Sequence, residues 1–371
     1  MGSSAAAEAR PARVVITGVG VVNAAIVGDS AALGAFLAAP RPATGVAHGG
    51  VARVSSSVLA GLIDPADARR LSRVCQLSIA AARLAVRESG IDARGGLGLV
   101  IGTEFGDLAS TQVFANGFLE RGPAGLSPLL FPNTVMNTMA ATTAIAVGAR
   151  ELALTLNAPT VAGELAVARA AAAVAAGRAR AVLAGGVDEI DALVERELPE
   201  VGFGGDTLGE GAAFVVLESR ATAEARGAVI LGEIAAATWR TLPARPWGVG
   251  RQRRSKAVQA VLNDAGLAPA DLGAVYGSAS GDRARDAWEQ AVLVTALGDT
   301  TLPVSSLARL LGRHAGLGVL RVAAAAWTAR SGLLPAAAAS PAELTRVTSP
   351  TGLVHGLARG GGHVALVVAE P

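Results

Sequence analysis

Two kinds of hydrophobic pattern alternate along the chain. Residues 13–22 (RVVITGVGVV), 97–102 and 209–218 are short continuous apolar runs, whereas residues 69–90 carry apolar side chains at the spacing of one helix face. A short continuous apolar run is typical of a strand buried on both faces, and the three-to-four-residue spacing is typical of an amphipathic helix. Because helix and strand segments follow one another, the pattern predicts an α/β fold built in layers.

The second part of the chain repeats this order of segments. An apolar run at 227–236 is followed by a helical segment at 255–265 and a strand at 272–277, which is the layout of residues 69–102. The letters alone do not demonstrate an internal repeat, because a shared order of helix and strand is weak evidence.

The stretch at residues 152–188 organises the rest of the chain. It predicts a short apolar strand, a tight turn at 157–160, a long alanine-rich helix and a second apolar strand that ends at Gly185 and Gly186. A residue on such a turn lies at the positive end of the helix dipole, where acyl-transfer enzymes place a nucleophile. Here that residue is Thr160.

This stretch resembles the nucleophile region of the β-ketoacyl-acyl carrier protein synthases, or ketosynthases. Their turn reads roughly T-V-S-T-A-C-A-S-G, and residues 155–163 (TLNAPTVAG) match it at Thr155 and Gly163 and place Thr160 on the cysteine. Residues 209–218 (GEGAAFVVLE) are similar to the family's G-E-G-A-x-x-x-V-L-E almost throughout. The resemblance implies the thiolase fold, in which two duplicated α/β halves form a five-layer αβαβα arrangement.

The same resemblance implies how the chain is divided and how it assembles. We expect a disordered tail at residues 1–12, an N-terminal thiolase-like half at 13–225 and a C-terminal half at 226–371. The strand at 152–158 is expected to pair antiparallel with its counterpart across a dimer, because its edge would otherwise lie exposed. Such an interface should be apolar and bury more than ~2,000 Å² in total.

Both histidines of the ketosynthase pattern are replaced. Residues 275–289 align with H-G-T-x-T-x-x-N-D-x-x-E through Asp286 and Glu289, which places Ser278 on the first histidine. Residues 304–318 align with V-N-S-x-K-x-x-x-G-H-x-x-G and place Arg313 on the second histidine, while His314 is one residue out of step.

These replacements remove the chemistry of condensation. A condensing enzyme needs a thiolate to hold the acyl chain and neutral imidazoles to donate toward the developing enolate oxygen. Removing one such donor typically costs about 10²- to 10³-fold in rate. A threonine hydroxyl without an adjacent base is a poor nucleophile, and an arginine does not cycle a proton. We therefore expect no catalytic residue, and the degenerate positions are Thr160, Ser278 and Arg313.

The resemblance also implies a tunnel and a gate. The segment 102–150 is similar to the ketosynthase segment that lines the acyl tunnel, so Leu108, Thr111, Ala115 and Phe118 are candidates for setting how long a chain fits. The alternative is that these four are ordinary core residues. Arg359 stands where a gating phenylalanine usually lies, which suggests that no acyl chain enters through this subunit's own entrance.

A chain that keeps the ketosynthase fold while each catalytic residue is replaced resembles the chain length factors of type II polyketide synthases. Those proteins pair with an active ketosynthase in a heterodimer and help to limit the length of the growing chain, for aromatic or reduced polyene products. The expected partners are that ketosynthase and an acyl carrier protein, whose phosphopantetheine carries the chain, so no cofactor or metal of its own is expected. The alternative is an acyltransferase or hydrolase of the same fold, with its catalytic set relocated to Thr160, Ser278, Ser280, Asp282 and His314.

Composition narrows these classes further. The 371 residues are 51% hydrophobic and 17% charged, and no apolar run reaches the ~20 residues that span a bilayer, so we expect no membrane partner and a cytoplasmic protein. The one cysteine, Cys75, fits a buried helix position. The excess of basic over acidic residues is small, which argues against nucleic acid as a partner.

Four cations at the start of the second half are either a docking patch for an acidic carrier protein or a solvated charge run. They are Arg251, Arg253, Arg254 and Lys256.

Overall fold

The computed structural model describes residues 11–47, 50–200, 205–298, 302–335 and 344–371. Within these residues, eleven strands form one sheet in the order β4-β3-β5-β6-β1-β7-β13-β12-β8-β9, with β2 beside β1, and β10 and β11 form a separate pair. The strands are β1 (Val14–Asn23), β2 (Val27–Gly28), β3 (Leu97–Thr103), β4 (Ala153–Asn157), β5 (Ala181–Asp188), β6 (Gly211–Ser219), β7 (Gly232–Thr241), β8 (Ala274–Tyr276), β9 (Val304–Ser305), β10 (Leu333–Pro335), β11 (Leu344–Arg346), β12 (Thr351–Leu357) and β13 (Gly362–Ala369).

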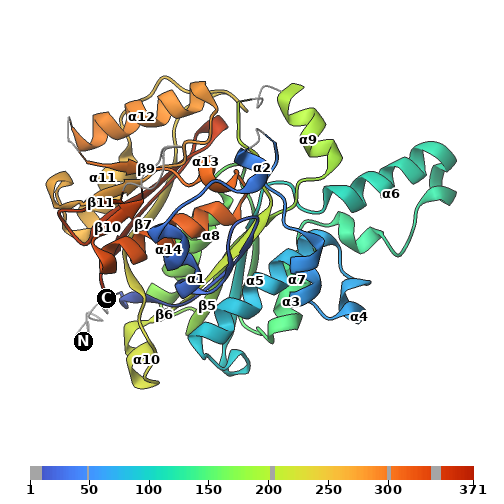
Figure 1. Cartoon of the computed structure of the whole chain (residues 1–371), viewed down its shortest axis with the longest axis horizontal. Helices are drawn as coiled ribbons and strands as arrows, with labels where there is room; N and C mark the ends of the chain where they lie inside the picture. Colours follow the sequence, from blue (N-terminus) through green and yellow to red (C-terminus); the bar gives the residue numbers. More distant parts are fainter. Residues whose placement is uncertain (1–10, 48–49, 201–204, 299–301, 336–343) are drawn as a thin grey trace, which may run out of the picture.

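The helices connect and cover these strands (Figure 1). They are α1 (Ser30–Ala38), α2 (Thr44–Ala47), α3 (Ser56–Leu62), α4 (Pro65–Ala68), α5 (Arg73–Ser89), α6 (Leu108–Arg121), α7 (Thr138–Val147), α8 (Ala162–Ala175), α9 (Ala192–Leu198), α10 (Arg220–Ala225), α11 (Lys256–Ala265), α12 (Arg283–Leu297), α13 (Ala308–Leu311) and α14 (Gly316–Ser331). No helix among the described residues is long and apolar enough to cross a membrane.

The sheet is internally repetitive. Strands β4, β3 and β5 run parallel and are followed by the antiparallel strands β6 and β1, and β9, β8, β12, β13 and β7 repeat this pattern from the other end. The two sets meet where β1 pairs antiparallel with β7 through Val14, Val15 and Ile16. The division at residue 225 stays a prediction, and of the expected tail, residues 1–10 lie outside the described part of the chain.

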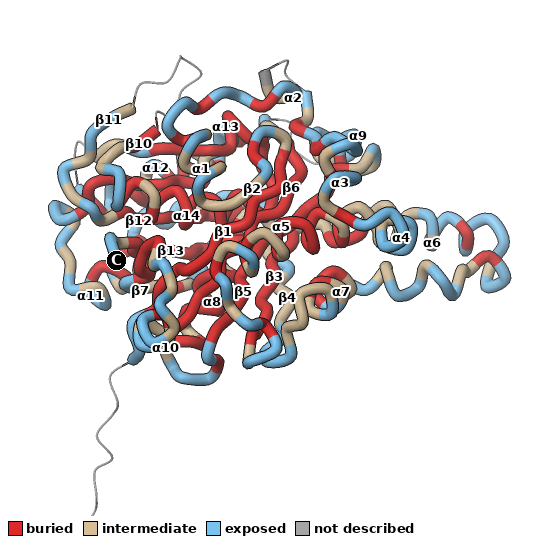
Figure 2. Tube along the Cα trace, turned by 60° about the horizontal axis from the view of Figure 1, so that its bottom comes forward, coloured by how far each residue is buried: buried red, intermediate tan, exposed pale blue. Residues whose placement is uncertain are grey.

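Helices and strands stack in the five layers that the family resemblance implies. Helices α5 and α7 cover the outer face of the first set of strands and α11 covers that of the second, while α8 and α14 pack against each other between the two sets. Alternate side chains of β5 show the layering, because Val182 and Ala184 belong to the central core while Leu183 packs beneath α5. Cys75 of α5 is buried in that outer core, as predicted. Figure 2 shows the buried α8 and α14 near the middle of the molecule.

A long arm leaves this body. Helix α6 and the 3-10 helices η2 (Gly122–Gly125) and η3 (Phe131–Thr134) project to one side in both views (Figures 1 and 2). The large exposed apolar side chains of residues 113–145, on the arm and on the neighbouring α7, are Val113, Phe118, Leu119, Leu129, Phe131, Val135, Met136 and Ile145. Strand β4 lies at the open edge of the sheet, where the sequence predicts it, and it is only partly buried.

Candidate active site

Thr160 lies on a strained turn between β4 and α8. Its φ is +69°, and the Val161 N–H donates to the Pro159 carbonyl at 2.8 Å, so Thr160 is the central residue of a three-residue turn. A β-branched residue in this left-handed region costs about 1–3 kcal/mol. The predicted strand, turn and helix are confirmed, and the turn keeps a conformation that a fold maintains at functional sites.

Close packing brings the segments that carry Arg313 and Arg359 toward the start of α8. A methyl group on Gly163 would overlap with the carbonyl oxygen of Ala315, two residues after Arg313. A methyl group on Gly362, close to Arg359, would lie 3.6 Å from Val161 Cγ2. The segments that carry Thr160, Arg313 and Arg359 therefore meet at one place.

Ser278 is buried and its hydroxyl is fully engaged. Its Oγ donates to Glu289 Oε1 at 2.7 Å and accepts from Arg285 Nη1 at 3.0 Å and from the Leu357 N–H at 3.1 Å. The hydroxyl proton is held by a carboxylate, so Ser278 offers no donor to a reacting carbonyl.

Behind Ser278 lies a buried chain of two histidines that sequence reasoning missed. His355 Nδ1 is 2.7 Å from Glu289 Oε1, His355 Nε2 is 2.7 Å from His363 Nε2, and His363 Nε2 is 3.3 Å from Ser255 Oγ. Burial alone would raise the pKa of Glu289, but the hydrogen bond and charge of His355, and then Arg285, lower it to about 2. Burial and the neighbouring His355 lower the pKa of His363 to about 3. The sequence signal was a histidine in each of two apolar runs, which alone does not reveal a contact.

Arg313 lies in a buried group of carboxylates. Its Nη1 pairs with Glu104 Oε2, and its Nε is 2.9 Å from Asp206 Oδ2, close enough for an ion pair although not aligned as a hydrogen bond. Burial would lower the pKa of Arg313, but Glu104, Asp206 and Asp188 outweigh burial and raise it. Burial and the charge of Glu104 raise the pKa of Asp188 to about 6. Arg313 is therefore a permanent cation with carboxylates as partners.

His314 does not take over the role of the lost histidine. It is buried, neither ring nitrogen has a hydrogen-bond partner in the described part of the chain, and its ring lies against Gly316. Burial and the adjacent Arg313 charge lower the pKa of His314 to about 3. The ring is neutral and, within the described residues, makes no hydrogen bond to Thr160.

The remaining members of the relocated set are also engaged elsewhere. Ser280 donates its hydroxyl proton to Asp206, and Asp282 accepts Arg359 Nη2 at 2.8 Å and Arg359 Nε. Within the described residues, no hydroxyl, imidazole and carboxylate chain forms at Thr160.

Arg359 is held in place at the predicted gate. Besides its two bonds to Asp282, its Nη1 donates to the Trp247 carbonyl at 3.1 Å. Burial would raise the pKa of Asp282, but the Arg359 hydrogen bond outweighs burial and lowers it. The gate position is thus a fixed cation rather than a free apolar ring.

The four tunnel candidates share one face of α6. Leu108 and Thr111 are partly buried, whereas Ala115 and Phe118 are exposed, the latter by 48%. The alternative of ordinary core residues is wrong for Ala115 and Phe118, and the tunnel role stays a prediction.

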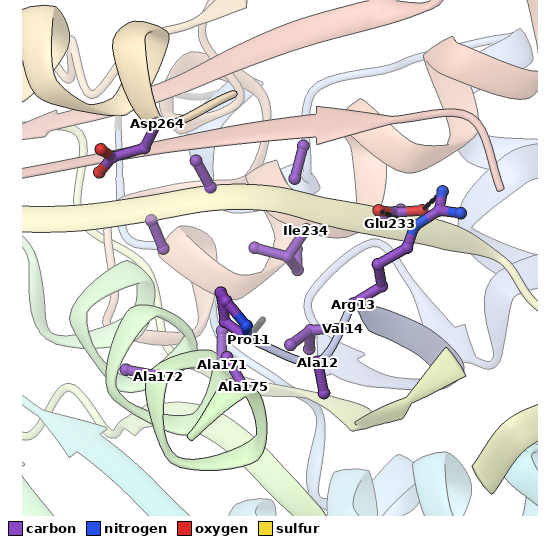
Figure 3. A pocket seen from close by; sticks show the side chains of 13 residues that line it. Pro11, Ala12, Arg13, Val14, Ala171, Ala172, Ala175, Glu233, Ile234 and Asp264 are labelled. Atoms are coloured by element: carbon purple, nitrogen blue, oxygen red, sulfur yellow. Dashed lines mark hydrogen bonds and ion pairs between the residues drawn. The ribbon is translucent and has the colours of Figure 1, made fainter. Parts of the chain in front are cut away.

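A hollow of about 410 Å³ lies elsewhere, between the end of α8 and β7 (Figure 3). It is lined by Ala171, Ala172 and Ala175 of α8 and rimmed by the Arg13 and Glu233 ion pair. Because Thr160 precedes the opposite end of α8, this hollow does not belong to the candidate site.

Known proteins match both halves of the chain. Residues 52–197 match the family model of the beta-ketoacyl synthase N-terminal domain, and residues 244–340 match that of the C-terminal domain. A 3-oxoacyl-[acyl-carrier-protein] synthase 2 of Staphylococcus aureus (strain N315) is 28% identical over 241 residues, which span 57% of this chain and only 57% of that protein. The synthase 2 of Vibrio cholerae serotype O1 is 26% identical over 330 residues, or 77% of this chain and 78% of that protein.

Solved structures share the fold over almost the whole chain. The structure described as the ishigamide ketosynthase/chain length factor superposes with a TM-score of 0.86 at 22% identity and covers 97% of this chain and 100% of that one. A type II ketosynthase in complex with its acyl carrier protein gives a TM-score of 0.78 at 18% identity, with the same coverage. The fold is therefore the thiolase fold predicted above, and the chain belongs to the β-ketoacyl synthase family.

Proposed function

We propose that this protein is a chain length factor-like, non-catalytic subunit that pairs with an active ketosynthase and shapes the acyl tunnel of a type II polyketide synthase. The observation that carries the proposal is the state of the three degenerate positions. Thr160 lacks a base, the Ser278 proton is bound to Glu289, and Arg313 is paired with Glu104. The side chains of Ser278 and Arg313 are thus engaged in structural contacts, and Thr160 lies on a strained turn.

This site lacks the groups that each step of condensation requires. The acyl chain needs a nucleophile whose proton can be removed, and the neutral His314 makes no hydrogen bond to Thr160 within the described residues. The enolate oxygen needs donors preorganised toward it, worth about 10²- to 10³-fold each. Ser278 points its proton at a carboxylate and so offers no donor. The Arg313 charge is balanced by carboxylates, and although its Nη2 has no hydrogen-bond partner among the described residues, a guanidinium does not cycle a proton as the family's histidine does.

The proposed ketosynthase partner would bind along β4 and the arm. Strand β4 is an open sheet edge, and α6 with η3 exposes large apolar side chains such as Phe118, Leu129 and Phe131, of which Leu129 is 89% exposed. Contiguous exposed apolar surface beside an open strand edge favours association with another chain. The tunnel candidates on α6 would then face the shared interface.

The proposed carrier-protein contact is a basic segment beside the gate. Residues 240–256 hold no acidic residue, and their exposed cations are Arg240, Arg245, Arg251, Arg253, Arg254 and Lys256. The segment is joined to the gate because the Gly360 N–H donates to the Gly248 carbonyl at 2.8 Å. An acidic carrier protein would be attracted to this surface.

The experiment is reconstitution of the pair with malonyl-loaded carrier protein. We expect the chain to co-purify with a ketosynthase, to make no product alone and to change the product length when the tunnel is altered. Ala115→Phe should shorten the products, whereas Ala228→Phe, remote from the arm, should leave their length unchanged. Product from the chain alone would favour the relocated enzyme, and an unchanged length would refute the tunnel role.

A further inference from the structure

A cavity lies at the carboxyl ends of β3 and β5, beside the degenerate site. Its volume is about 540 Å³, and it is lined by the segment before α3, by the first turns of α5 and α6, and by the residues after β5. Ligands of open α/β sheets bind outside the carboxyl ends of strands, and small-molecule sites measure about 300–1,000 Å³. Its size and position are those of a small-molecule site.

The arginines of this cavity are already neutralised. Arg53 Nη2 is 2.6 Å from Glu195 Oε2, and Arg53 also donates to the Ile190 carbonyl. Arg73 Nε donates to the fully buried Glu210 Oε2 at 3.1 Å, and Arg73 Nη2 pairs with the other oxygen. Arg73 also feels the charge of Glu189, as the smallest of the effects on its pKa, but neither arginine forms an ion pair with another carboxylate of the wall within the described residues.

Three carboxyl groups of the wall have no ion-pair partner of their own among the described residues. They belong to Asp107, Glu189 and Asp191, and none of them forms an ion pair within the described residues. Asp107 caps α6 by accepting the Ser110 N–H at 2.9 Å, and Asp191 caps α9 by accepting the Val194 N–H at 2.8 Å. Glu189 remains.

Glu189 is a buried acid with an unused acceptor. It is 4% exposed, and its Oε2 has no hydrogen-bond partner in the described part of the chain, although the Val74 N–H at the start of α5 supports the carboxyl. Burial and then the charge of Asp107, with smaller effects of Asp191 and Glu210, raise the pKa of Glu189 to about 7. The Oε2 atom lacks a hydrogen-bond donor and the carboxyl lacks an ion-pair partner within the described residues, and a cationic donor would supply both.

We propose that this cavity binds a ligand that carries a primary ammonium group, with Glu189 as its counter-ion. An ammonium has three N–H donors and no acceptor, which suits a wall of carboxyl oxygens. A metal ion fits less well, because the described residues contain no group of three or more histidine, cysteine or acidic side chains placed to hold one. The inference goes beyond the proposed function, since it holds whether or not the chain assists condensation.

Isothermal titration of the full chain tests this site. The probe is n-butylammonium chloride, and n-butanol at the same concentration and ionic strength is the neutral comparison. We expect the ammonium to bind at least tenfold more tightly than the alcohol, and Glu189→Gln to weaken ammonium binding about tenfold. Asp264→Asn, an exposed acid outside this cavity, is the matched control and should leave binding unchanged.

Proton release gives a second readout that does not depend on a variant. The bound ammonium lowers the raised pKa of Glu189, so binding at pH 7 should release protons, measured as heats that differ between buffers of unlike ionisation enthalpy. At pH 8.5 the carboxyl is already ionised and the release should vanish. Equal binding of butanol, no binding heat, or ammonium binding at pH 7 without proton release would overturn the proposal.

Discussion

Restoring the family's histidine at position 313 should weaken the protein rather than activate it. In Arg313→His, the buried Glu104 and Asp206 lose a permanent cation, and Asp188 loses a compensating charge. Removing one partner of a buried ion pair costs about 3–5 kcal/mol. At about 2.1 cal/mol/K of unfolding entropy per residue, that cost lowers the melting temperature by about 4–6 °C.

The loss should depend on pH in a defined direction. The surrounding carboxylates raise the folded-state pKa of the new imidazole, so its stabilising charge is present below pH ~6.5 and is lost as the pH rises through that pKa. We therefore expect the deficit to be largest at pH 8 and to shrink at pH 5.5. An imidazole is shorter than a guanidinium and pairs with fewer carboxylates, so the recovery should be partial.

Thermal unfolding followed by circular dichroism at pH 5.5 and pH 8 measures this difference. Arg309→His, at an exposed arginine of α13, is the matched control and should change the melting temperature by less than 1 °C, about the effect of a surface substitution. If Arg313→His were as stable as the unmodified protein at pH 8, the buried carboxylates would not depend on Arg313 and the reasoning would be refuted.

Three further substitutions probe the turn, the gate and the arm. Thr160→Gly relieves the strain of the left-handed backbone and should raise the free energy of unfolding, measured by urea titration, by about 1 kcal/mol. Thr160→Val keeps the β-branch and should leave that free energy unchanged. A lower free energy of unfolding with glycine would exclude strain at Thr160. In a Thr160→Cys background, Asp282→Asn removes the ion pair of Arg359 and should speed maleimide labelling of the new thiol about tenfold, while Asp264→Asn should not. Unchanged labelling would show that this ion pair does not close the entrance. Leu129→Asp should weaken ketosynthase binding at least tenfold without changing the melting temperature. Val229→Asp, at a side chain that is 72% exposed on another segment, should change neither the binding nor the melting temperature. If Leu129→Asp bound the ketosynthase as tightly as the unmodified protein, the arm would not belong to the interface.

The sequence was most informative where the structure is local. The strand, turn and helix around Thr160 are encoded by an apolar run, a proline-containing turn and an alanine-rich segment that follow one another directly. The helix expected at 255–265 forms with Ser255 as its cap, because a serine there accepts the Val258 N–H. The strand expected at 227–236 begins later, at Gly232, because Gly227 adopts a φ of +69° after α10.

The partners of the degenerate residues were beyond sequence reasoning because they are distant along the chain. Arg313 pairs with Glu104 across 209 positions, and Glu164 of α8 pairs with Arg321 of α14 across 157 positions in the central layer. No periodicity or motif links such residues until the layers bring them together. The histidine chain has the same origin, because His355 reaches Glu289 from a different layer, 66 positions away.

The most direct measurement is the intact mass of this chain after incubation with acyl carrier protein loaded with an acyl group, alone and in complex with its ketosynthase. We predict that the mass of this subunit stays unchanged in both cases, while the ketosynthase gains the acyl group on its cysteine. An acyl adduct on this subunit, mapped by peptide sequencing to Thr160 or Ser278, would contradict the account.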